Sequence, residues 1–304
     1  MRGVAGGAGV VTFPAPTTVG GTLPLTVTCT PASGTRFTTG GTPVACLAMD
    51  AQGRQATCSF TVTVTPLLID VKRFIAFGDS ITAGENGRPS PLNRFVDFPN
   101  LYPVKLEGLL NAEYPDQGIV VLNRGKGAEF VEDGVKRLKD VLEADHGDVL
   151  LLLGGYNDLL AECTPDRSAS AACGRQIDEV VSGIRECIRI AQVSAYGIKY
   201  VFVSTITPPG PLVGTRDRRI AGDAVVRTNA ALATMVGTQG AVLVDTYARF
   251  VGHEAEYVDE DGLHLRPAGY QAMAQAFFDA IRQAVPGTPG LRSFPSPGRQ
   301  TVSR

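Results

Sequence analysis

The chain has 304 residues, of which 44% are apolar, so it is long enough to bury the core of one large domain or of two smaller ones. Its 28 basic and 30 acidic side chains give a formal charge of −2, and no basic run would follow a phosphate backbone, so nucleic acid is not expected as a partner. No apolar run approaches the roughly 20 residues that cross a bilayer, which argues against a membrane span.

The N-terminus and the cysteines bear on the compartment in which the protein works. The opening stretch, MRGVAGGAGVV, lacks the apolar core and the cleavage motif of a signal peptide, so an export signal is expected to be absent from this chain. Six cysteines occur without any CxxC pair, a pattern that favours disulfides over a zinc site. We therefore expect an extracytoplasmic protein, either secreted or held at the cell surface.

The first part of the chain has the pattern of a β-domain. Up to Pro66 only four residues are charged, while threonine, valine and glycine dominate. Apolar and polar residues alternate at 25–29 and 59–64, which is the period of strands with one buried face. The segment is therefore predicted to be a small antiparallel sandwich, with turns at Ser33-Gly34, Gly40-Gly41 and Gln52-Gly53.

The composition changes again at two further points. Charged residues and helical periods become frequent after Val71, so a domain boundary is expected near 65–69. The last segment is rich in Pro, Gly and Ser and is expected to be disordered. The predicted domains are a β-module at 1–66, an α/β domain at 67–286 and a tail at 287–304.

The run from Cys29 to Val64, CTPASGTRFTTGGTPVACLAMDAQGRQATCSFTVTV, resembles a hyalin-repeat (HYR) module. Such modules are immunoglobulin-like domains of extracellular and bacterial surface proteins, and the resemblance covers most of residues 9–65. In that family a first strand, often with a cysteine, precedes the point where this chain begins, so the module is expected to be truncated at its N-terminus. The preferred disulfide is Cys29 with Cys58. Its rival is Cys46 with Cys58, because a hairpin centred near Gln52 would set these two residues opposite each other.

From Arg73 onward, apolar runs of strand length alternate with amphipathic patterns of helix length. In the interval 175–195, for example, apolar residues recur at steps of three and four. This alternation indicates a parallel sheet covered on both faces, with sites beyond the carboxyl ends of its strands. The expected strands are 74–77, 119–122, 149–153, 200–205 and 241–244. The expected helices are 99–113, 130–144, 175–195, 221–236 and 267–284.

Ser80 follows the first of these strands, in the stretch FGDSITAG. A nucleophilic serine needs a neighbouring base, and histidine is the usual one because its pKa lies near neutral pH. His146 lies at the start of the third strand, on the opposite edge of the sheet, and His253 lies in a polar loop with no evident partner. His264 has Asp261 three residues before it, a spacing at which the carboxylate can fix the imidazole tautomer. Ser80, His264 and Asp261 are therefore the candidate nucleophile, base and orienting acid.

The oxyanion of an acyl-transfer intermediate needs hydrogen-bond donors. The backbone N–H of Ser80, at the start of a helix, is the first candidate. The second is an N–H in the glycine-containing loop at 123–129, which follows the second strand. The side-chain amide of Asn157, which follows the third strand, is the last candidate.

Four sequence blocks, in this order, resemble the SGNH (GDSL) hydrolase superfamily. They are FGDSIT around Ser80, NRGKGAE at 123–129, GGYND at 154–158, and DGLH at 261–264 followed by RPAGY. The resemblance spans residues 74–270 and implies ester hydrolysis on a flavodoxin-like, three-layer α/β fold, without a metal or another cofactor. Carried over to matching positions, it makes Ser80 the nucleophile, His264 the base, Asp261 its orienter and Asn157 an oxyanion donor, with Asp79 and Gly155 in support.

Two positions depart from the family pattern. Ala128 stands where the second block usually has glycine, and glycine comes one place earlier, at Gly127. Because the donor is a backbone N–H, Ala128 can serve if its φ is negative, and otherwise the register shifts to Gly127. Tyr156 stands where threonine or glycine is usual, so it is expected to crowd the site and to narrow the acyl pocket.

The later cysteines have structural interpretations. Cys163 and Cys173 bracket a loop rich in Ala and Ser beside the third block, where a disulfide that stiffens the rim is expected. Cys187 lies on the apolar face of a helix and is expected in the core.

The resulting hypothesis is a serine ester hydrolase that acts on a small-molecule or polysaccharide ester, with short-chain acyl or carbohydrate O-acetyl groups as its substrates. The alternative is a non-catalytic surface binding or adhesion protein on a retired hydrolase fold, against which the complete Ser, Asn, Asp and His set argues. A third hypothesis, compatible with the first, gives the HYR-like module a glycan or a surface to bind. The loops at 85–100 and 207–220 are expected to shape the pockets, but their residues do not identify the substrate.

Overall fold

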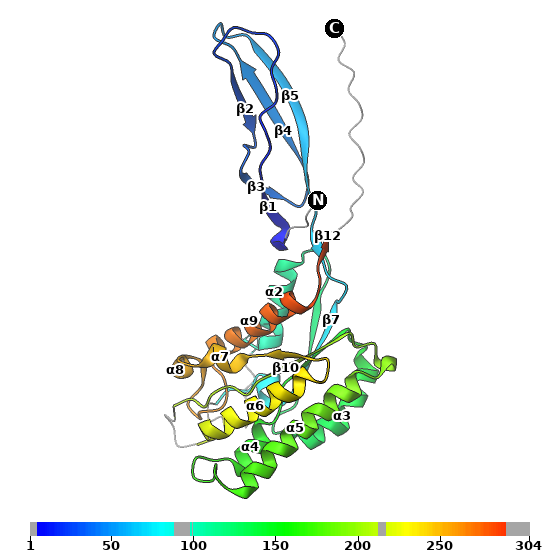
Figure 1. Ribbon diagram of the computed structural model, residues 1–304, viewed down its shortest axis with the longest axis vertical. Coiled ribbons are helices and arrows are strands. Elements are labelled where there is room, and N and C mark those ends of the chain that lie inside the picture. Colours follow the sequence, from blue (N-terminus) through cyan, green and yellow to red (C-terminus); the bar gives the residue numbers. More distant parts are fainter. Residues whose placement is uncertain (1–4, 88–97, 99, 212–216, 290–304) are drawn as a thin grey trace. The chain divides into compact units, whose positions relative to one another are not determined.

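The computed structural model describes residues 5–87, 98, 100–211 and 217–289 (Figure 1). These residues fall into two compact units. The first contains the chain up to Asp70, residues 112–117 and the chain from Gly287, and the second contains Val71–Asn111 and Gly118–Pro286. Of the predicted disordered tail, 290–304 lie outside the described residues, as do 88–97, 99 and 212–216 of the two predicted pocket loops.

The described part of the first unit contains antiparallel sheets, as the alternation in its sequence predicts, and the two described next form its core. One sheet pairs β1 with β3, and the other has the order β2-β4-β5. A cluster of buried residues from both sheets, Phe37, Val44, Cys46, Val62 and Val64, forms its core. Gly40-Gly41, expected between strands, instead opens β4. The elements are η1 (Ala5–Gly7), β1 (Ala8–Val11), β2 (Thr26–Thr30), β3 (Thr35–Thr38), β4 (Gly40–Met49), β5 (Gln55–Val64), and β6 (Leu67–Leu68) paired with β12 (Thr288–Pro289).

The disulfide of the first unit differs from both pairs considered from the sequence. Cys29 is bonded to Cys46, while Cys58 is a free, exposed thiol. The predicted hairpin does set Cys46 opposite Cys58, but β2 pairs along the other edge of β4 and sets Cys29 opposite Cys46 as well. Cys46, on the middle strand β4, thus has one cysteine opposite it on each neighbouring strand. It forms its disulfide with Cys29 on β2.

The second unit is built on a parallel sheet of five strands in the order β11-β10-β9-β7-β8. Within this sheet the first strand in chain order, β7, lies between the second, β8, and the third, β9, which is the flavodoxin-like doubly wound order. Phe74, Ile75 and Leu151 are fully buried, as expected for strands covered on both faces. The strands β7 (Arg73–Gly78), β8 (Val120–Gly125), β9 (Val149–Leu152), β10 (Tyr200–Ser204) and β11 (Val242–Val244) confirm the predicted runs.

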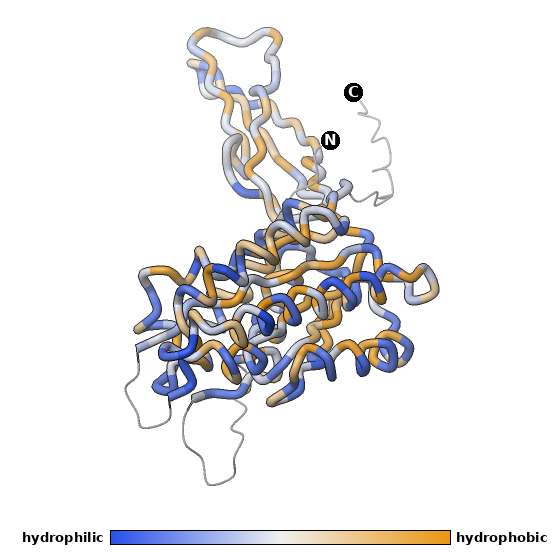
Figure 2. Tube along the Cα trace, turned by 60° about the horizontal axis from the view of Figure 1, so that its bottom comes forward, coloured by the Kyte–Doolittle hydropathy of each residue, from blue (hydrophilic) through white to orange (hydrophobic). Residues whose placement is uncertain are grey.

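Two helical layers cover this sheet (Figure 1). In one layer α5 lies between α3 and α6, and in the other α2 meets α9, with the rings of Tyr102 and Phe277 stacked 5.2 Å apart. Hydrophobic and hydrophilic residues alternate along helical parts of the chain (Figure 2), and α3, α5 and α9 have the amphipathic pattern of helices that bury one side. Among the helices that the structure describes, none is long and apolar enough to cross a membrane. The long helices are α2 (Tyr102–Glu113), α3 (Val131–Asp145), α5 (Ala171–Ala191), α6 (Gly222–Gly237) and α9 (Pro267–Ala284).

Shorter helices follow several strands at the edge where the candidate residues gather. They interrupt the connections between the carboxyl ends of the strands and the long helices, and so they fix individual side chains at that edge. These elements are α1 (Ser80–Ala83), α4 (Tyr156–Glu162), α7 (Thr246–Phe250) and α8 (Glu254–Tyr257). The 3-10 turn η2 (Ser194–Tyr196) lies between α5 and β10, at the opposite edge of the sheet.

Candidate active site

Ser80 is the first residue of α1, directly beyond the carboxyl end of β7. Asp79 caps this helix, because its Oδ1 accepts a hydrogen bond from the N–H of Ile81 at 3.0 Å. Both residues are buried, with Ser80 only 3% exposed. Strand β7 and the cap therefore hold the serine in one place at the edge of the sheet.

His264 and Asp261 come from the turn that precedes α9. Nε2 of His264 lies 2.9 Å from Oγ of Ser80, and Nδ1 lies 2.6 Å from Oδ2 of Asp261. Oδ1 of Asp261 accepts hydrogen bonds from the N–H groups of Leu263 and His264, so the carboxylate is held by the turn that it orients. The structure therefore brings together the three residues that the sequence singled out, in the order acid, imidazole and hydroxyl.

Burial by itself would raise the pKa of Asp261, but its hydrogen bond with His264 and its two backbone donors hold that pKa below its usual range. The carboxylate therefore stays ionised beside the imidazole. An ionised partner at Nδ1 keeps the proton on that nitrogen and leaves Nε2 free to accept a proton from Ser80. An arrangement of this kind can activate a serine hydroxyl as a nucleophile.

The other two histidines lie away from this cluster. His146 ends α3 in a left-handed conformation, before β9 begins, as expected from the sequence. His253 precedes α8, where its ring stacks on Tyr257 and its Nδ1 lies 3.5 Å from a carboxylate oxygen of Glu256. His253 thus has partners that sequence reasoning did not find, but its side chain is exposed and lies outside the cluster of Ser80, His264 and Asp261.

Asn157 lies in the first turn of α4, two residues after Gly155, which immediately precedes this helix. Gly155 has φ 101°, and a Cβ there would come 2.6 Å from Cγ1 of Val180, so only glycine fits. The side-chain Nδ2 of Asn157 donates to the backbone carbonyl of Glu129 at 3.0 Å. One amide hydrogen is thereby engaged, and the second remains for another acceptor.

The loop after β8 makes a tight turn at 126–129. The N–H of Lys126 donates to the carbonyl of Gly78 at 2.8 Å, and the N–H of Glu129 donates to the carbonyl of Lys126 at 3.3 Å. Within this turn Ala128 has φ 58°, a left-handed conformation that favours glycine. Ala128 was expected to serve as an oxyanion donor only if its φ were negative, and its φ is positive. The same condition makes Gly127 the preferred donor.

Three charged residues that sequence reasoning did not single out lie in this loop or near it. The carboxylate of Asp158 accepts the N–H of Val131 and so caps α3, and burial raises the pKa of Asp158 to about 6. The carboxylate of Glu129 forms two hydrogen bonds with Arg137, of 2.6 and 2.5 Å. Glu129 and Asp158 do lie within the predicted blocks, whereas Arg137 has no motif to mark it.

In the described parts of the chain no cluster of His, Cys, Asp or Glu is arranged to hold a metal ion.

Tyr156, the unusual residue of the third block, is fully buried. Its hydroxyl accepts the N–H of Thr207 at 2.9 Å and lies 3.1 Å from the Oγ1 of the same residue. The aromatic ring therefore ties α4 to the segment that follows β10. Its effect on an acyl pocket stays a prediction.

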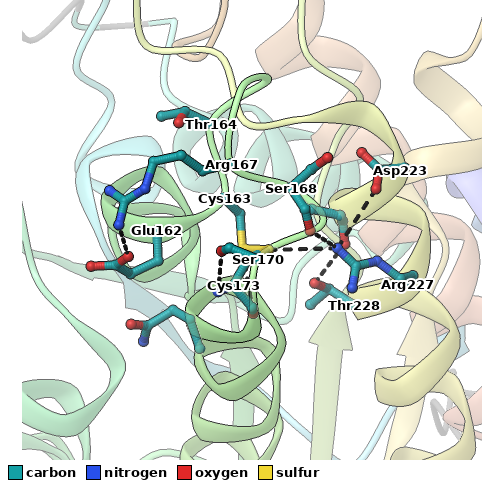
Figure 3. The surroundings of a disulfide bond; sticks show 12 residues. Glu162, Cys163, Thr164, Arg167, Ser168, Ser170, Cys173, Asp223, Arg227 and Thr228 are labelled. Atoms are coloured by element: carbon teal, nitrogen blue, oxygen red, sulfur yellow. Dashed lines mark hydrogen bonds and ion pairs between the residues drawn. A yellow bond between two sulfur atoms is a disulfide. The ribbon is translucent and has the colours of Figure 1, made fainter.

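A disulfide joins Cys163, at the end of α4, to Cys173, in the first turn of α5 (Figure 3). Ser170 caps α5 by accepting the N–H of Cys173, and Arg227 lies against the disulfide, with its Nη2 3.5 Å from Sγ of Cys173. The carbonyl of Cys163 also accepts the N–H of Ala221. The disulfide attaches the end of α4, the helix that carries Asn157, to α5, and it is the disulfide expected from the sequence at this place. Cys187 is buried, as predicted.

Comparison with protein families gives two matches. Residues 76–272 match the GDSL-like Lipase/Acylhydrolase family, and residues 10–64 match the HYR domain. The first match contains all four blocks described above, and the second begins within β1 and covers β2 to β5 of the first unit.

Two characterised proteins resemble parts of the chain. The spore germination lipase LipC of Bacillus licheniformis is 27% identical over 213 residues, which are 67% of this chain and 93% of that protein. An acetylxylan esterase of Geobacillus stearothermophilus is 32% identical over 88 residues, which are 29% of this chain and 40% of that protein.

Solved structures show the same fold at low sequence identity. A lipase/acylhydrolase from Enterococcus faecalis aligns with a TM-score of 0.53 at 19% identity, over 73% of this chain and all of the other. The acetylxylan esterase from Geobacillus stearothermophilus gives 0.52 at 22% identity, over 70% of this chain and 95% of the other. The aryl esterase of M. smegmatis gives 0.54 at 18% identity, over 70% and 99%.

Proposed function

Because the chain belongs to the GDSL-like lipase/acylhydrolase family, and carries an N-terminal HYR domain, we propose that it is a serine ester hydrolase that works through an acyl-enzyme on Ser80. The observation that carries this proposal is the continuous chain of contacts from Asp261 through His264 to Ser80, at 2.6 and 2.9 Å. All three side chains are at most 3% exposed, so the contacts are shielded from water.

In the first half of the reaction Oγ of Ser80 attacks the ester carbonyl carbon while Nε2 of His264 takes its proton. Asp261 accepts from Nδ1 and stabilises the imidazolium that forms. When the tetrahedral intermediate collapses, His264 returns the proton to the leaving alcohol and an acyl-Ser80 ester remains. Water then repeats the same steps, with His264 as its base, and releases the acid.

The oxyanion formed in each half is proposed to receive three hydrogen bonds. They come from the N–H of Ser80, from the N–H of Gly127, and from the second amide hydrogen of Asn157. The described contacts support this set, because Gly127 does not donate its N–H within the described part of the chain, and Asn157 uses one hydrogen on Glu129. Asp79 and Gly155 support the set through the cap of α1 and the left-handed start of α4.

Short acyl groups, such as acetyl, are the proposed substrates. Ser80 is 3% exposed, which favours a small group over a long chain at the nucleophile. The similarity to acetylxylan esterases supports a carbohydrate O-acetyl ester as one substrate class. The two disulfides support a location outside the cytoplasm.

The proposal is tested with Ser80→Ala and with Ser204→Ala as a matched buried serine that only bonds within the fold. Ser80→Ala is expected to abolish hydrolysis of p-nitrophenyl acetate and labelling by a fluorophosphonate without a change in circular dichroism, while Ser204→Ala retains both. Unchanged turnover in Ser80→Ala would refute the mechanism. A native protein that is neither active nor labelled would favour the non-catalytic alternative.

The substrate class is tested by a series of p-nitrophenyl esters, run beside acetylated xylan and pectin. The rate is expected to fall as the acyl chain lengthens from acetyl. A maximum at long chains would contradict the short-acyl proposal. A role of the HYR domain in holding the enzyme on a glycan stays a prediction, which a pull-down of the Ser80→Ala chain on these polysaccharides tests.

A further inference from the structure

The orientation of Asn157 depends on the position of Glu129. The Nδ2 of Asn157 donates to the carbonyl oxygen of Glu129 at 3.0 Å, and both residues are buried. A carboxamide is planar, so fixing one of its two N–H bonds also fixes the direction of the other. The amide hydrogen that is available for an oxyanion therefore points where the Glu129 carbonyl makes it point.

Glu129 is in turn held by Arg137. Nε of Arg137 lies 2.6 Å from Oε1 of Glu129, and Nη2 lies 2.5 Å from Oε2. The carboxylate is 3% exposed, and a buried carboxylate is costly unless its charge is paired. The two parallel hydrogen bonds also fix the plane of the carboxylate, which a single contact would not do.

Arg137 is itself located by β7. Its guanidinium carbon lies 4.1 Å from the centre of the Phe77 ring, and Phe77 precedes Ser80 by three residues on the strand that presents the nucleophile. A guanidinium over an aromatic face is an attractive and directional contact. A chain of contacts thus runs from the nucleophile strand through Arg137 and Glu129 to the amide of Asn157.

The same pair controls the turn at 126–129. The N–H of Glu129 closes this turn on the carbonyl of Lys126, and Ala128 within it has an unfavourable left-handed φ of 58°. A side chain anchored at Glu129 opposes relaxation of that backbone. The turn and Asn157 are the two places from which oxyanion donors other than Ser80 are proposed to come.

We propose that Glu129 and Arg137 are a positioning pair for the oxyanion hole. Neither residue contacts the substrate. Their ion pair fixes the Glu129 carbonyl, which aims Asn157, and fixes the turn that carries Gly127 and Ala128. This inference rests on the proposed function, because it acts through the oxyanion of ester hydrolysis.

The test compares Glu129→Gln and Arg137→Lys with the native enzyme on p-nitrophenyl acetate. Each is expected to lower kcat roughly 10- to 100-fold and to leave KM within about twofold, because the oxyanion donors act in the transition state and contribute little to ground-state binding. Labelling of Ser80 by a fluorophosphonate is expected to slow in parallel. The double variant is expected to lose little more than either single one, because both substitutions break the same pair.

Asp145→Asn is the matched control. Asp145 is also buried and also receives two hydrogen bonds from one arginine, Arg124, both of 2.6 Å, but it contacts neither Asn157 nor the turn. This variant is expected to lower the melting temperature and to retain kcat. Comparison with it separates a positioning effect from general loss of a buried ion pair.

Three results would overturn the inference. One is native kcat in both Glu129→Gln and Arg137→Lys while Ser80→Ala is inactive, which would leave the proposed function intact. Another is a loss of kcat that Asp145→Asn reproduces at equal stability. Full activity in Ser80→Ala would overturn the proposed function and this inference together. If Arg137→Lys does not fold, Glu129→Gln with its kcat, KM and melting temperature decides alone.

Discussion

Oγ of Ser80 and Nε2 of His264 lie 2.9 Å apart although 184 residues separate them in the chain. Ser80 follows the first strand of the sheet and His264 precedes the last helix, so the doubly wound order of the strands is what brings them together. The same edge receives Asn157 from the third strand. The candidate catalytic groups therefore meet at one edge of the sheet, and substitutions there are expected to separate effects on catalysis from effects on folding.

Asn157→Ala is expected to lower kcat by roughly 10²- to 10³-fold with little change in KM, because it removes one donor to the oxyanion. Steady-state kinetics on a short-chain ester measure this. Asn111→Ala is the matched control, since Asn111 bonds both backbone groups of Ile119 and lies in α2. That variant should lose stability but retain kcat. Equal kinetic losses in both variants would argue against a role for Asn157 in the transition state.

Ala128→Gly is expected to stabilise the protein by about 0.5–1 kcal/mol. A φ of 58° costs an L-residue roughly 1–2 kcal/mol, and glycine avoids this cost. Glycine also has more conformational freedom in the unfolded chain, which reduces the net gain in stability. Urea denaturation measures the difference. His146→Gly, with φ 50° at the end of α3, should show a similar gain away from the site. Stabilisation at His146 together with destabilisation at Ala128 would contradict the strain inferred for the turn.

Asp79→Asn is expected to change how stability depends on pH. Burial raises the pKa of Asp79 to about 7, and its Oδ2 has no hydrogen-bond partner among the described residues. The folded state therefore binds this proton more tightly than the unfolded state does. Its stabilising effect is complete below the unfolded pKa of 3.8 and is lost as the pH rises through about 7.

Asparagine keeps the cap of α1 but carries no charge, so the variant should be more stable than the native protein above pH 7, by on the order of 1–4 kcal/mol. The two proteins should converge near pH 4. Urea denaturation at several pH values gives the difference curve, in which contributions from other groups cancel. A difference that does not vary with pH would show that Asp79 is not protonated in the folded state at neutral pH.

The cysteines predict a definite pattern of labelling. Iodoacetamide should modify Cys58 in the native protein, whereas Cys187, whose thiol pKa burial raises to about 12, should react only after unfolding. A tryptic map without reduction should show Cys29 linked to Cys46, since Arg36 and Arg54 place the three early cysteines in separate peptides. A peptide that links Cys58 to either of the others would contradict the observed pairing.

Local patterns were enough for much of the fold. The five apolar runs and the amphipathic intervals between them correspond to the five strands and to the long helices, because burial on both faces or on one face leaves its period in the sequence. The pairing of cysteines in the disulfide of the first unit could not be predicted from local patterns. Hairpin geometry relates Cys46 to Cys58, but the pairing of β2 with β4, which brings in Cys29, is a nonlocal choice.

The sequence by itself determined the identity of the candidate nucleophile, base, acid and amide, because each follows a strand at the same edge and together they form a family pattern. Only the tertiary structure decided how these groups are held. The left-handed backbone of Ala128 depends on the closure of a turn, and the Glu129–Arg137 pair depends on α3 packing over Phe77. Such contacts join residues with no shared period or motif, and they arise from packing in three dimensions, which one-dimensional patterns do not record.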